Sequence, residues 1–345
     1  MFEAKLRDGI VWKRLIEAIK EILKEGVFEC KSDGMHLQTM DPNKMTLVSV
    51  FLEANSFDDF KCRSNIDLGL NFDSMLKILK TGAPKDIVTV KSDGKNIAFT
   101  FEAINEHRVA DFEMSLFHKD YENLEVPDTF YDAVIEMPSI EFQKVMRDMK
   151  DFGDTVVILC KKQQIQFSTL GDIANVDITL KGKVVKDKKT KNQKNLLDFV
   201  GKHGDAPEIE IEREEIKIED ESDIPNYLEI QIGDEIGSAT KTKKAAKKIK
   251  QEIKEESEDE ENEESSGITI NLRRNAPLDM NFNLKYLNLF AKASLCENVK
   301  LFMKENQPLL VEYKIDIIDE TNNVKKLGYL RYYLAPKLES AQDEQ

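Results

Sequence analysis

The feature that most constrains this chain is an internal repeat. Residues 70–80 (LNFDSMLKILK) and 282–292 (FNLKYLNLFAK) each begin with alternating apolar positions, change to helical spacing and end in Lys. Residues 9–24 and 139–150 form a second matching pair, two predicted amphipathic helices that are each followed by Gly and alternating strands. The sequence therefore predicts an α+β chain made of two copies of one unit: a helix, several strands, a second helix and more strands.

The repeat also predicts the domain boundaries. The first domain covers residues 1–116, a connector with neither period covers 117–134, and the second domain covers 135–345. The second domain is interrupted at 183–266, where the sequence becomes highly charged and has few aromatic residues. Such a composition cannot bury enough apolar surface to offset the entropy of ordering, so we expect a disordered insertion.

Charge and hydropathy exclude some classes of function. The 345 residues include 50 Lys and Arg and 65 Asp and Glu, for a net charge of −15. This balance argues against binding nucleic acid over the whole surface, but it allows one segregated basic face. No apolar run approaches the ~18 residues of a membrane span, and the first 25 residues do not follow a signal-peptide pattern, so we expect a soluble intracellular protein.

Basic residues recur on the polar side of all four predicted helices. On the first helix, the basic side lies opposite Val11, Leu15 and Ile19. The basic residues of the four helices are Lys13, Arg14 and Lys20, then Lys77 and Lys80, then Lys144 and Arg147, and finally Lys285 and Lys292. A single charged helix face is usually only solvated, but its recurrence in an acidic chain favours one positive surface suited to phosphates and without base-reading geometry.

No catalytic constellation competes with this interpretation. The four histidines have no metal-ligand spacing, and the sequence has no Gly-rich phosphate loop, so we expect neither enzymatic activity nor a metal or cofactor. Cys30, Cys62, Cys160 and Cys296 lie far apart, which favours reduced, buried thiols over disulfides or zinc ligands.

Several segments make the chain recognisable. They are MFEAKL at the start, LQTMDPNKMTLVSVFL at 37–52, SMLKILK at 74–80, GDTVVILC at 153–160, LVEYKI at 310–315 and LRYYLAPKLE at 330–339. With these segments the chain resembles the proliferating cell nuclear antigen family of eukaryotic DNA sliding clamps, over nearly all of its length outside the insertion. A smaller departure, IDETNN at 318–323, indicates a lengthened hairpin between the last two strands.

The resemblance implies a closed homotrimeric ring of six similar domains, with helices lining the hole and sheets outside. The nine basic residues named above would then face duplex DNA, which the ring encircles without sequence preference. Subunits would join head to tail, with a strand near His107–Leu116 pairing with Ile173–Lys181 of the next subunit. The implied role is a nuclear, non-enzymatic processivity factor for DNA polymerase, loaded by a clamp loader. A subunit of a heterotrimeric checkpoint-type clamp is the alternative, and a monomeric DNA-processing enzyme would need a catalytic cluster that is not visible.

The resemblance further implies an apolar pocket under the connector. In this family the pocket binds replication and repair proteins through peptides of the pattern Gln-x-x-aliphatic-x-x-aromatic-aromatic. The matching positions here are Met40, Lys44, Met45, Leu47, Leu124, Val126, Pro127, Pro308, Tyr333, Ala335 and Pro336. Lys44 and Met45 differ from the usual family residues.

The insertion carries two short patterns. Gln193, Leu196 and Phe199 in QKNLLDFV fit the clamp-binding peptide except for Val200 in place of the last aromatic residue. The segments IKIE, IKQE and IKEE place lysines in the acceptor pattern for the small ubiquitin-like modifier, and a further lysine outside the insertion matches the family's ubiquitin acceptor. The candidate modification sites are Lys217, Lys250 and Lys254 for the first pattern, and Lys162 for the second.

Overall fold

The computed structural model describes residues 1–103, 107–118, 129–184, 267–318 and 323–337, all of which fall in one compact unit. Its four α-helices are α1 (Ile10–Ile19), α2 (Phe72–Leu79), α3 (Ser139–Met149) and α5 (Leu284–Phe290), and η1 (Ala54–Ser56) is a single 3-10 turn. The strands of the first repeat are β1 (Phe2–Leu6), β2 (Glu25–Lys31), β3 (Gly34–Met40), β4 (Thr46–Glu53), β5 (Asp59–Cys62), β6 (Ile66–Asn71), β7 (Ile87–Ser92), β8 (Asn96–Glu102) and β9 (Val109–Ser115). Those of the second are β10 (Ala133–Pro138), β11 (Thr155–Lys161), β12 (Gln164–Thr169), β13 (Val176–Lys181), β14 (Lys183–Val184), β15 (Thr269–Leu272), β16 (Leu278–Asn283), β17 (Asn298–Met303), β18 (Leu309–Ile318) and β19 (Val324–Leu334).

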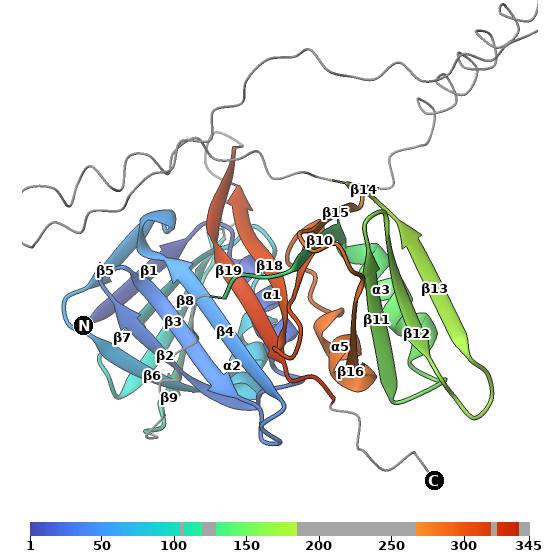
Figure 1. Ribbon diagram of the computed structural model, residues 1–345. Coiled ribbons are helices and arrows are strands. Elements are labelled where there is room, and N and C mark those ends of the chain that lie inside the picture. Colours follow the sequence, from blue (N-terminus) through green and yellow to red (C-terminus); the bar gives the residue numbers. More distant parts are fainter. Residues whose placement is uncertain (104–106, 119–128, 185–266, 319–322, 338–345) are drawn as a thin grey trace, which may run out of the picture. The chain divides into compact units, whose positions relative to one another are not determined.

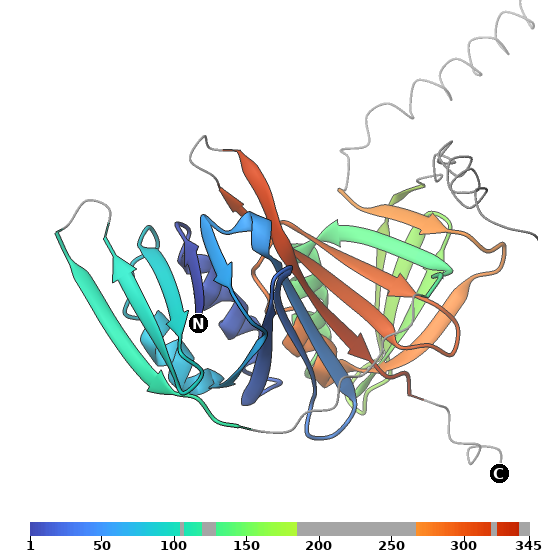
Figure 2. The same ribbon diagram turned by 90° about the vertical axis from the view of Figure 1, so that its left-hand side faces the viewer.

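The described strands form three sheets that follow the repeat. One sheet has the order β5-β1-β7-β8-β9, and another has the order β13-β12-β11-β16. The third, with the order β14-β15-β10-β17-β18-β19-β4-β3-β2-β6, contains the counterparts of both smaller sheets joined edge to edge by β19 and β4. In Figure 1 the strands β3, β4, β18 and β19 of this sheet face the viewer, with α1 and α2 behind them; Figure 2 shows the same layers turned by 90°. The predicted pair of similar α+β domains is confirmed.

The second helix of each repeat begins in the same way. Asn71 ends β6 and its side chain accepts a hydrogen bond of 2.9 Å from the backbone N–H of Ser74. Asn283 ends β16 and accepts one of 3.0 Å from the N–H of Lys285. A capping Asn stops the strand and satisfies a free amide of the first helical turn, so the predicted change from strand to helix within 70–80 and 282–292 is confirmed.

The first helix is shorter than predicted. It ends at Ile19 rather than at residue 24, because the chain turns there and enters β2 at Glu25. The turn keeps Ile22 and Leu23 buried, with the N–H of Leu23 bonded to the carbonyl of Ile19. The periodic burial of these two residues extended the helical pattern beyond the real helix.

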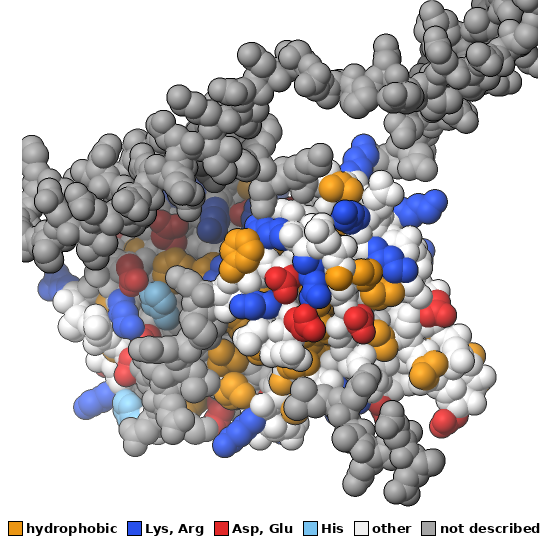
Figure 3. Space-filling model, viewed as in Figure 1, with side chains coloured by type: hydrophobic (Ala, Val, Ile, Leu, Met, Phe, Trp, Pro, Cys, Tyr) orange, Lys and Arg blue, Asp and Glu red, His pale blue; other side chains and the backbone are white. Residues whose placement is uncertain are grey.

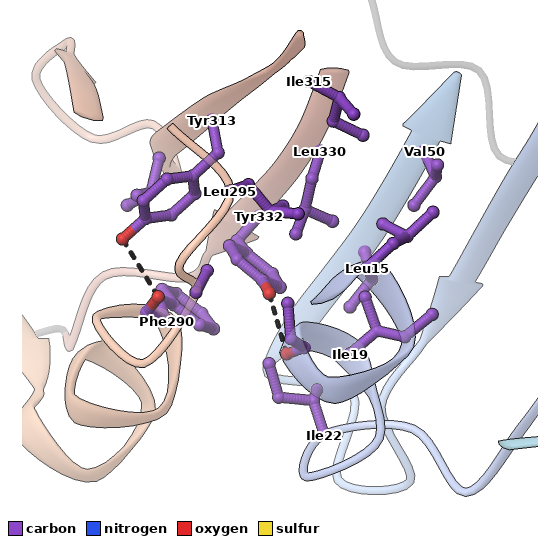
Figure 4. Close-up of a cluster of buried hydrophobic side chains, with 14 of the residues drawn as sticks. Leu15, Ile19, Ile22, Val50, Phe290, Leu295, Tyr313, Ile315, Leu330 and Tyr332 are labelled. Carbon is purple, nitrogen blue, oxygen red and sulfur yellow. Dashed lines mark hydrogen bonds between the residues drawn. The ribbon is translucent and has the colours of Figure 1, made fainter. Parts of the chain in front are cut away.

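An apolar core joins the two repeats (Figure 4). Tyr332 of β19 lies fully buried, stacked on Phe290 of α5 with ring centroids 4.4 Å apart, and its hydroxyl donates to the carbonyl of Ala18 in α1 at 2.9 Å. Tyr313 of β18 donates to the carbonyl of Phe290 at 2.9 Å. Leu15 and Ile19 of α1 complete this cluster from the first repeat. The repeats therefore share both a sheet and a core.

All four cysteines are free, as predicted, but only two are buried. Cys30 and Cys160 are buried, whereas Cys62 and Cys296 are partly exposed. Burial raises the pKa of Cys160 to about 12 and that of Cys296 to about 11. Within the described part of the chain, no helix combines the length and apolar character needed to cross a membrane.

Candidate functional site

The predicted basic residues lie at exposed or half-exposed positions on or beside the four helices. Arg14, Lys77, Lys144, Arg147 and Lys285 project from helical turns and are exposed, whereas Lys13 is half-buried. The remaining residues, Lys20, Lys80 and Lys292, cap or follow the helix C-termini. Positive charge is favourable at a helix C-terminus, so this placement also stabilises the helices.

Acidic side chains are interleaved with these basic residues. Lys20 donates to Glu21 at 2.7 Å, a hydrogen bond that raises the pKa of Lys20, and Arg147 pairs with Asp148 at 3.4 Å. The hydrogen bond from Lys20 lowers the pKa of Glu21, and the charge of Lys292, from the other repeat, adds to this lowering. The charge of Lys292, which follows α5, is thus felt at the Glu21 carboxylate, which follows α1. The surface is basic on every helix but not uniformly positive.

Three predicted pocket residues form one row on the outer face of the ten-stranded sheet. Met40 lies opposite Leu47, and Leu47 lies opposite Tyr333. The N–H of Ala335 bonds to the carbonyl of Met45 at 3.1 Å, which fixes the chain after β19 beside the same face. Figure 3 shows hydrophobic side chains gathered on this face, with basic and acidic side chains around them.

A buried carboxylate supports the loop that ends this row. Asp41 is 3% exposed, and it accepts bonds of 2.7 Å from the backbone N–H groups of both Met45 and Thr46. The hydroxyl of Tyr286, in α5, donates to the same carboxylate at 2.7 Å. Lys44 completes the turn with φ of 57°, a left-handed conformation. The bond between Asp41 and Tyr286 therefore holds a loop of the first repeat against a helix of the second.

Several residues of this region were not predicted from the sequence. The Asp-Pro pair at 41–42 signals a turn, but nothing local indicates that Tyr286 would bind the Asp41 carboxylate. The apolar row also continues beyond Tyr333 through Leu310, Phe302 and Val134, as the pairing of β19, β18, β17 and β10 shows. Of the other predicted pocket residues, Pro308 is exposed, Pro336 is half-buried, and Leu124, Val126 and Pro127 lie outside the described residues.

The two strands predicted to join subunits are both sheet edges. β9 ends the five-stranded sheet and β13 ends the four-stranded sheet. Each has half-buried apolar residues on one side, namely Phe112 and Met114 in β9 with Leu116 directly after it, and Val176, Ile178 and Leu180 in β13. Near these edges Val109 is 64% exposed and Ile173 is 85% exposed. Such edges, apolar on one side, are suited to pairing with another strand.

The candidate modification sites divide by location. Lys162 is exposed in the turn between β11 and β12, where its amine is accessible. The other three, Lys217, Lys250 and Lys254, lie outside the described residues, as does the segment QKNLLDFV. Among the residues that the structure does describe, no group of His, Cys, Asp and Glu could hold a metal ion.

Two matched α+β repeats joined edge to edge, with basic residues on all four helices, define the class of DNA sliding clamps. Comparison with protein families supports this class: the model described as "Proliferating cell nuclear antigen, N-terminal domain" matches residues 1–123. The model described as "Proliferating cell nuclear antigen, C-terminal domain" matches 125–198 and 231–337. The chain belongs to the proliferating cell nuclear antigen family, as the resemblance of its sequence predicted. This is a family of non-enzymatic clamps that act on DNA in replication and repair.

Proposed function

We propose that this chain forms a closed homotrimer that encircles duplex DNA in the nucleus and tethers DNA polymerase to it. The clamp loader and other replication and repair proteins would bind the apolar row of Met40, Leu47 and Tyr333 through clamp-binding peptides. The nine basic residues of the helices would face the phosphates. Contacts with phosphates alone carry no sequence information, so they are compatible with sliding, while closure of the ring keeps the clamp on DNA.

The observation that carries this proposal is the repeat itself. β9 has the place in the first repeat that β19 has in the second, and β13 has the place of β4. β19 and β4 pair within the chain, whereas β9 and β13 are edges. The pairing that joins two repeats inside one molecule can therefore be made again between molecules. The pairing is head to tail, so repeating it closes a ring when the rotation between neighbouring subunits is a whole fraction of a turn, and one third of a turn gives the proposed trimer.

The registers predict which residues meet at this boundary. Phe2 of β1 and Ala133 of β10 have equivalent positions in the two repeats. Following the paired residues from Phe2 across β7 and β8 to β9, and from Ala133 across β17 and β18 to β19, shows that Phe112 has the position of Tyr332. The two capping residues, Asn71 and Asn283, are also equivalent. Following the paired residues from Asn71 across β2 and β3 to β4, and from Asn283 across β11 and β12 to β13, shows that Val176 has the position of Val48. Tyr332 lies opposite Val48. Phe112 should thus lie opposite Val176 of the next subunit.

Cysteine cross-linking tests both the ring and this register. In the predicted register Val109 lies opposite Thr179, so a chain carrying Val109→Cys and Thr179→Cys, with the native Cys62 and Cys296 changed to Ser, should form disulfides between subunits on mild oxidation. Directly opposite residues have Cβ atoms about 4.5–5.5 Å apart, near the range that a disulfide needs. The expected product is a covalent trimer that remains on circular DNA in high salt.

The control moves one cysteine along β13. Val109→Cys combined with Lys181→Cys is displaced by two residues and should cross-link much less, because diagonal neighbours are about 7–8 Å apart. Light scattering of the unmodified chain should give about three times 39.6 kDa. A monomer that neither cross-links nor associates would contradict the homotrimer and favour a subunit of a heterotrimeric clamp.

A further inference from the structure

We propose that a strip of aromatic side chains on the outer face of the ten-stranded sheet binds an arginine-bearing segment of a partner protein. The strip consists of His36, Phe51 and Tyr329, which lie directly opposite one another on the neighbouring strands β3, β4 and β19 (Figure 1). It is separate from the apolar row described above, because Tyr329 lies four residues from Tyr333 along β19, or about 13 Å away. The inference does not depend on the proposed function of that row.

The rings of the strip lie on the solvent side of the sheet, unlike their neighbours along the strands. Val50 precedes Phe51 and Leu330 follows Tyr329, and both are buried in the core (Figure 4). All three rings of the strip are only half-buried. The ring centroids of His36 and Phe51 are 4.6 Å apart, and those of Phe51 and Tyr329 are 5.8 Å apart. The rings therefore form one continuous surface, and exposed aromatic side chains are typical of binding surfaces.

One end of the strip already holds an arginine. The guanidinium of Arg331 lies 3.9 Å from the ring centroid of Tyr329, and its Nε donates to the carboxylate of Glu312 at 2.7 Å. A guanidinium suits both partners at once, since it stacks flat on a ring while its N–H groups bond to a carboxylate. An aromatic ring beside a carboxylate therefore acts as an arginine site in this sheet, and here the molecule supplies the arginine itself.

The other end of the strip has the same two components. Nε2 of His36 lies 3.2 Å from both carboxylate oxygens of Asp33, whose side chain is 61% exposed. Glu53 lies two residues after Phe51 on the same face, opposite Gly34. Among the described residues, no Arg or Lys stacks over Phe51 or His36. The rings and carboxylates at this end therefore form an arginine site that none of the described arginines occupies.

The charges at this end favour a basic partner. Four carboxylates lie beside His36 and Phe51 or continue their row across the sheet, namely those of Glu29, Asp33, Glu53 and Asp67. Two lysines lie among them: Lys31 pairs with Glu29, and Lys325 donates to the carbonyl of Asn55 at 2.6 Å. Exposed rings also stack on nucleic-acid bases, but this excess of carboxylates would repel the phosphates and attract a guanidinium. A protein segment is therefore the favoured occupant.

The length of the strip indicates what the segment carries besides arginine. His36 and Tyr329 are two strand spacings apart, or about 10 Å. In an extended segment, side chains on one face repeat every two residues, or about every 7 Å. The strip therefore accommodates two side chains of such a segment, an arginine at the His36 end and an apolar side chain towards Tyr329.

Selection from a random peptide library tests the proposal without a known partner. The target is the full chain, and the library is first depleted on a variant that carries Phe51→Thr and Asp33→Asn. Thr removes the ring but is itself suited to a strand, so the variant should fold. We expect the peptides that bind only the unmodified chain to be enriched in Arg over Lys, with an apolar residue two positions away. A selection that yields no such peptides, or peptides without Arg, would overturn the proposal.

The affinity of one selected peptide locates its site. Phe51→Thr and Asp33→Asn should each raise its Kd by about fivefold or more, the size expected for the loss of one cation–π contact or one charge-assisted hydrogen bond. Two matched controls should leave the Kd within about twofold, because such surface changes away from the contact have small effects. Tyr333→Ala truncates a half-buried ring of the apolar row, and Asp172→Asn neutralises an exposed carboxylate in the second repeat. Loss of binding in Tyr333→Ala alone would place the peptide on the apolar row and refute the proposed strip.

Two further measurements distinguish stacking from simple charge attraction and from nucleic-acid binding. Replacing the Arg of the selected peptide with Lys keeps the charge but removes the flat group, so it should weaken binding to the unmodified chain and make little difference in Phe51→Thr. Equal affinities of the two peptides for the unmodified chain would contradict an arginine site. A labelled single-stranded oligothymidine should show no difference between the unmodified chain and Phe51→Thr. Weaker oligonucleotide binding by the variant would mean that the strip stacks on bases, and the choice of a protein partner would be wrong.

Discussion

The molecule contains one junction between its two repeats, which the pairing of β19 with β4 closes. It also has two strands at sheet edges, β9 and β13, which would form the same kind of junction between subunits of the proposed ring. At the closed junction, β19 pairs with β4, and Tyr332 lies in a core shared by α1 and α5. At the open edges, Phe112 has the position of Tyr332 but is only half-buried. The inner face is apolar in both places. In the proposed ring the same structural unit would thus supply a permanent junction and a separable one, and the difference would lie in how much of the aromatic side chain its own molecule buries.

The outer faces of the two junctions differ in charge. Arg331 of β19 lies opposite Ser49 of β4, while it bonds to Glu312 at 2.7 Å and stacks over Tyr329 at 3.9 Å. In the register proposed for the open edges, Asp111 would lie opposite Asp177. Like charges directly opposite each other destabilise a strand pair. The boundary between subunits would therefore hold less tightly than the junction within one subunit.

Tyr332→Ala should have the largest effect, and on folding itself. It removes a buried aromatic ring from the core that joins the repeats, so we expect the free energy of unfolding to fall by about 3–5 kcal/mol. Denaturant titration measures this loss. Tyr332→Phe keeps the ring and loses only the bond to the Ala18 carbonyl, so it should cost about 1 kcal/mol. Similar costs for both variants would mean that the shared core is not what closes this junction.

Phe112→Ala should break the open junction and spare the subunit. The side chain is half-buried in the single chain, so its loss should change unfolding little, yet a buried aromatic at the centre of an interface can contribute 2 kcal/mol or more to binding. We expect light scattering to show masses falling toward 39.6 kDa on dilution. Phe302→Ala, which also truncates a half-buried ring but lies away from both edges, should leave the assembly intact. Dissociation by both variants would argue against a specific role for β9.

Tyr286→Phe should loosen a second link across the closed junction. The change removes the donor to Asp41, and hydrogen bonds to charged groups contribute about 1.5–3 kcal/mol. We expect a loss of stability in that range and weaker binding of a clamp-binding peptide, because Asp41 also fixes the N–H of Met45. Burial raises the pKa of Tyr286, which keeps its hydroxyl protonated as the donor. Unchanged peptide affinity would show that the Asp41 loop does not contribute to peptide binding.

Asp177→Asn should have the smallest effect and the opposite sign. Removing one of two opposed carboxylates should strengthen each subunit boundary by about 0.2–1 kcal/mol. The dissociation constant per boundary would then improve by up to about fivefold, as measured by subunit exchange between labelled rings. Asp172→Asn changes charge equally but lies before the paired strand, so it serves as the control. A weaker ring in Asp177→Asn would show that the register derived from the repeat is wrong.

The repeat and its helices were predictable because their signals are local. The capping residues Asn71 and Asn283 follow alternating apolar positions and precede helical spacing, so the change of structure is visible within a few residues. The link between Asp41 and Tyr286 was not visible, because it joins residues 245 positions apart through a single hydroxyl. The end of α1 was missed for another reason: Ile22 and Leu23 are buried whether the chain continues as helix or turns. The register proposed between β9 and β13 of neighbouring subunits could not be predicted from the sequence, because deriving it requires the residue pairing of every strand from β1 to β9.

The unbroken sheet across β19 and β4 determines where a closed ring could give way. Bending the molecule between its repeats would have to disrupt the seven residue pairs between β19 and β4 and open the core around Tyr332. Separating one subunit from the next would expose only β9 and β13, which already exist as ordered edges. Each subunit should therefore behave as a stiff arc of the ring. DNA would enter the hole through one opened boundary between two subunits. The elastic deformation that this opening needs would be distributed over all three subunits.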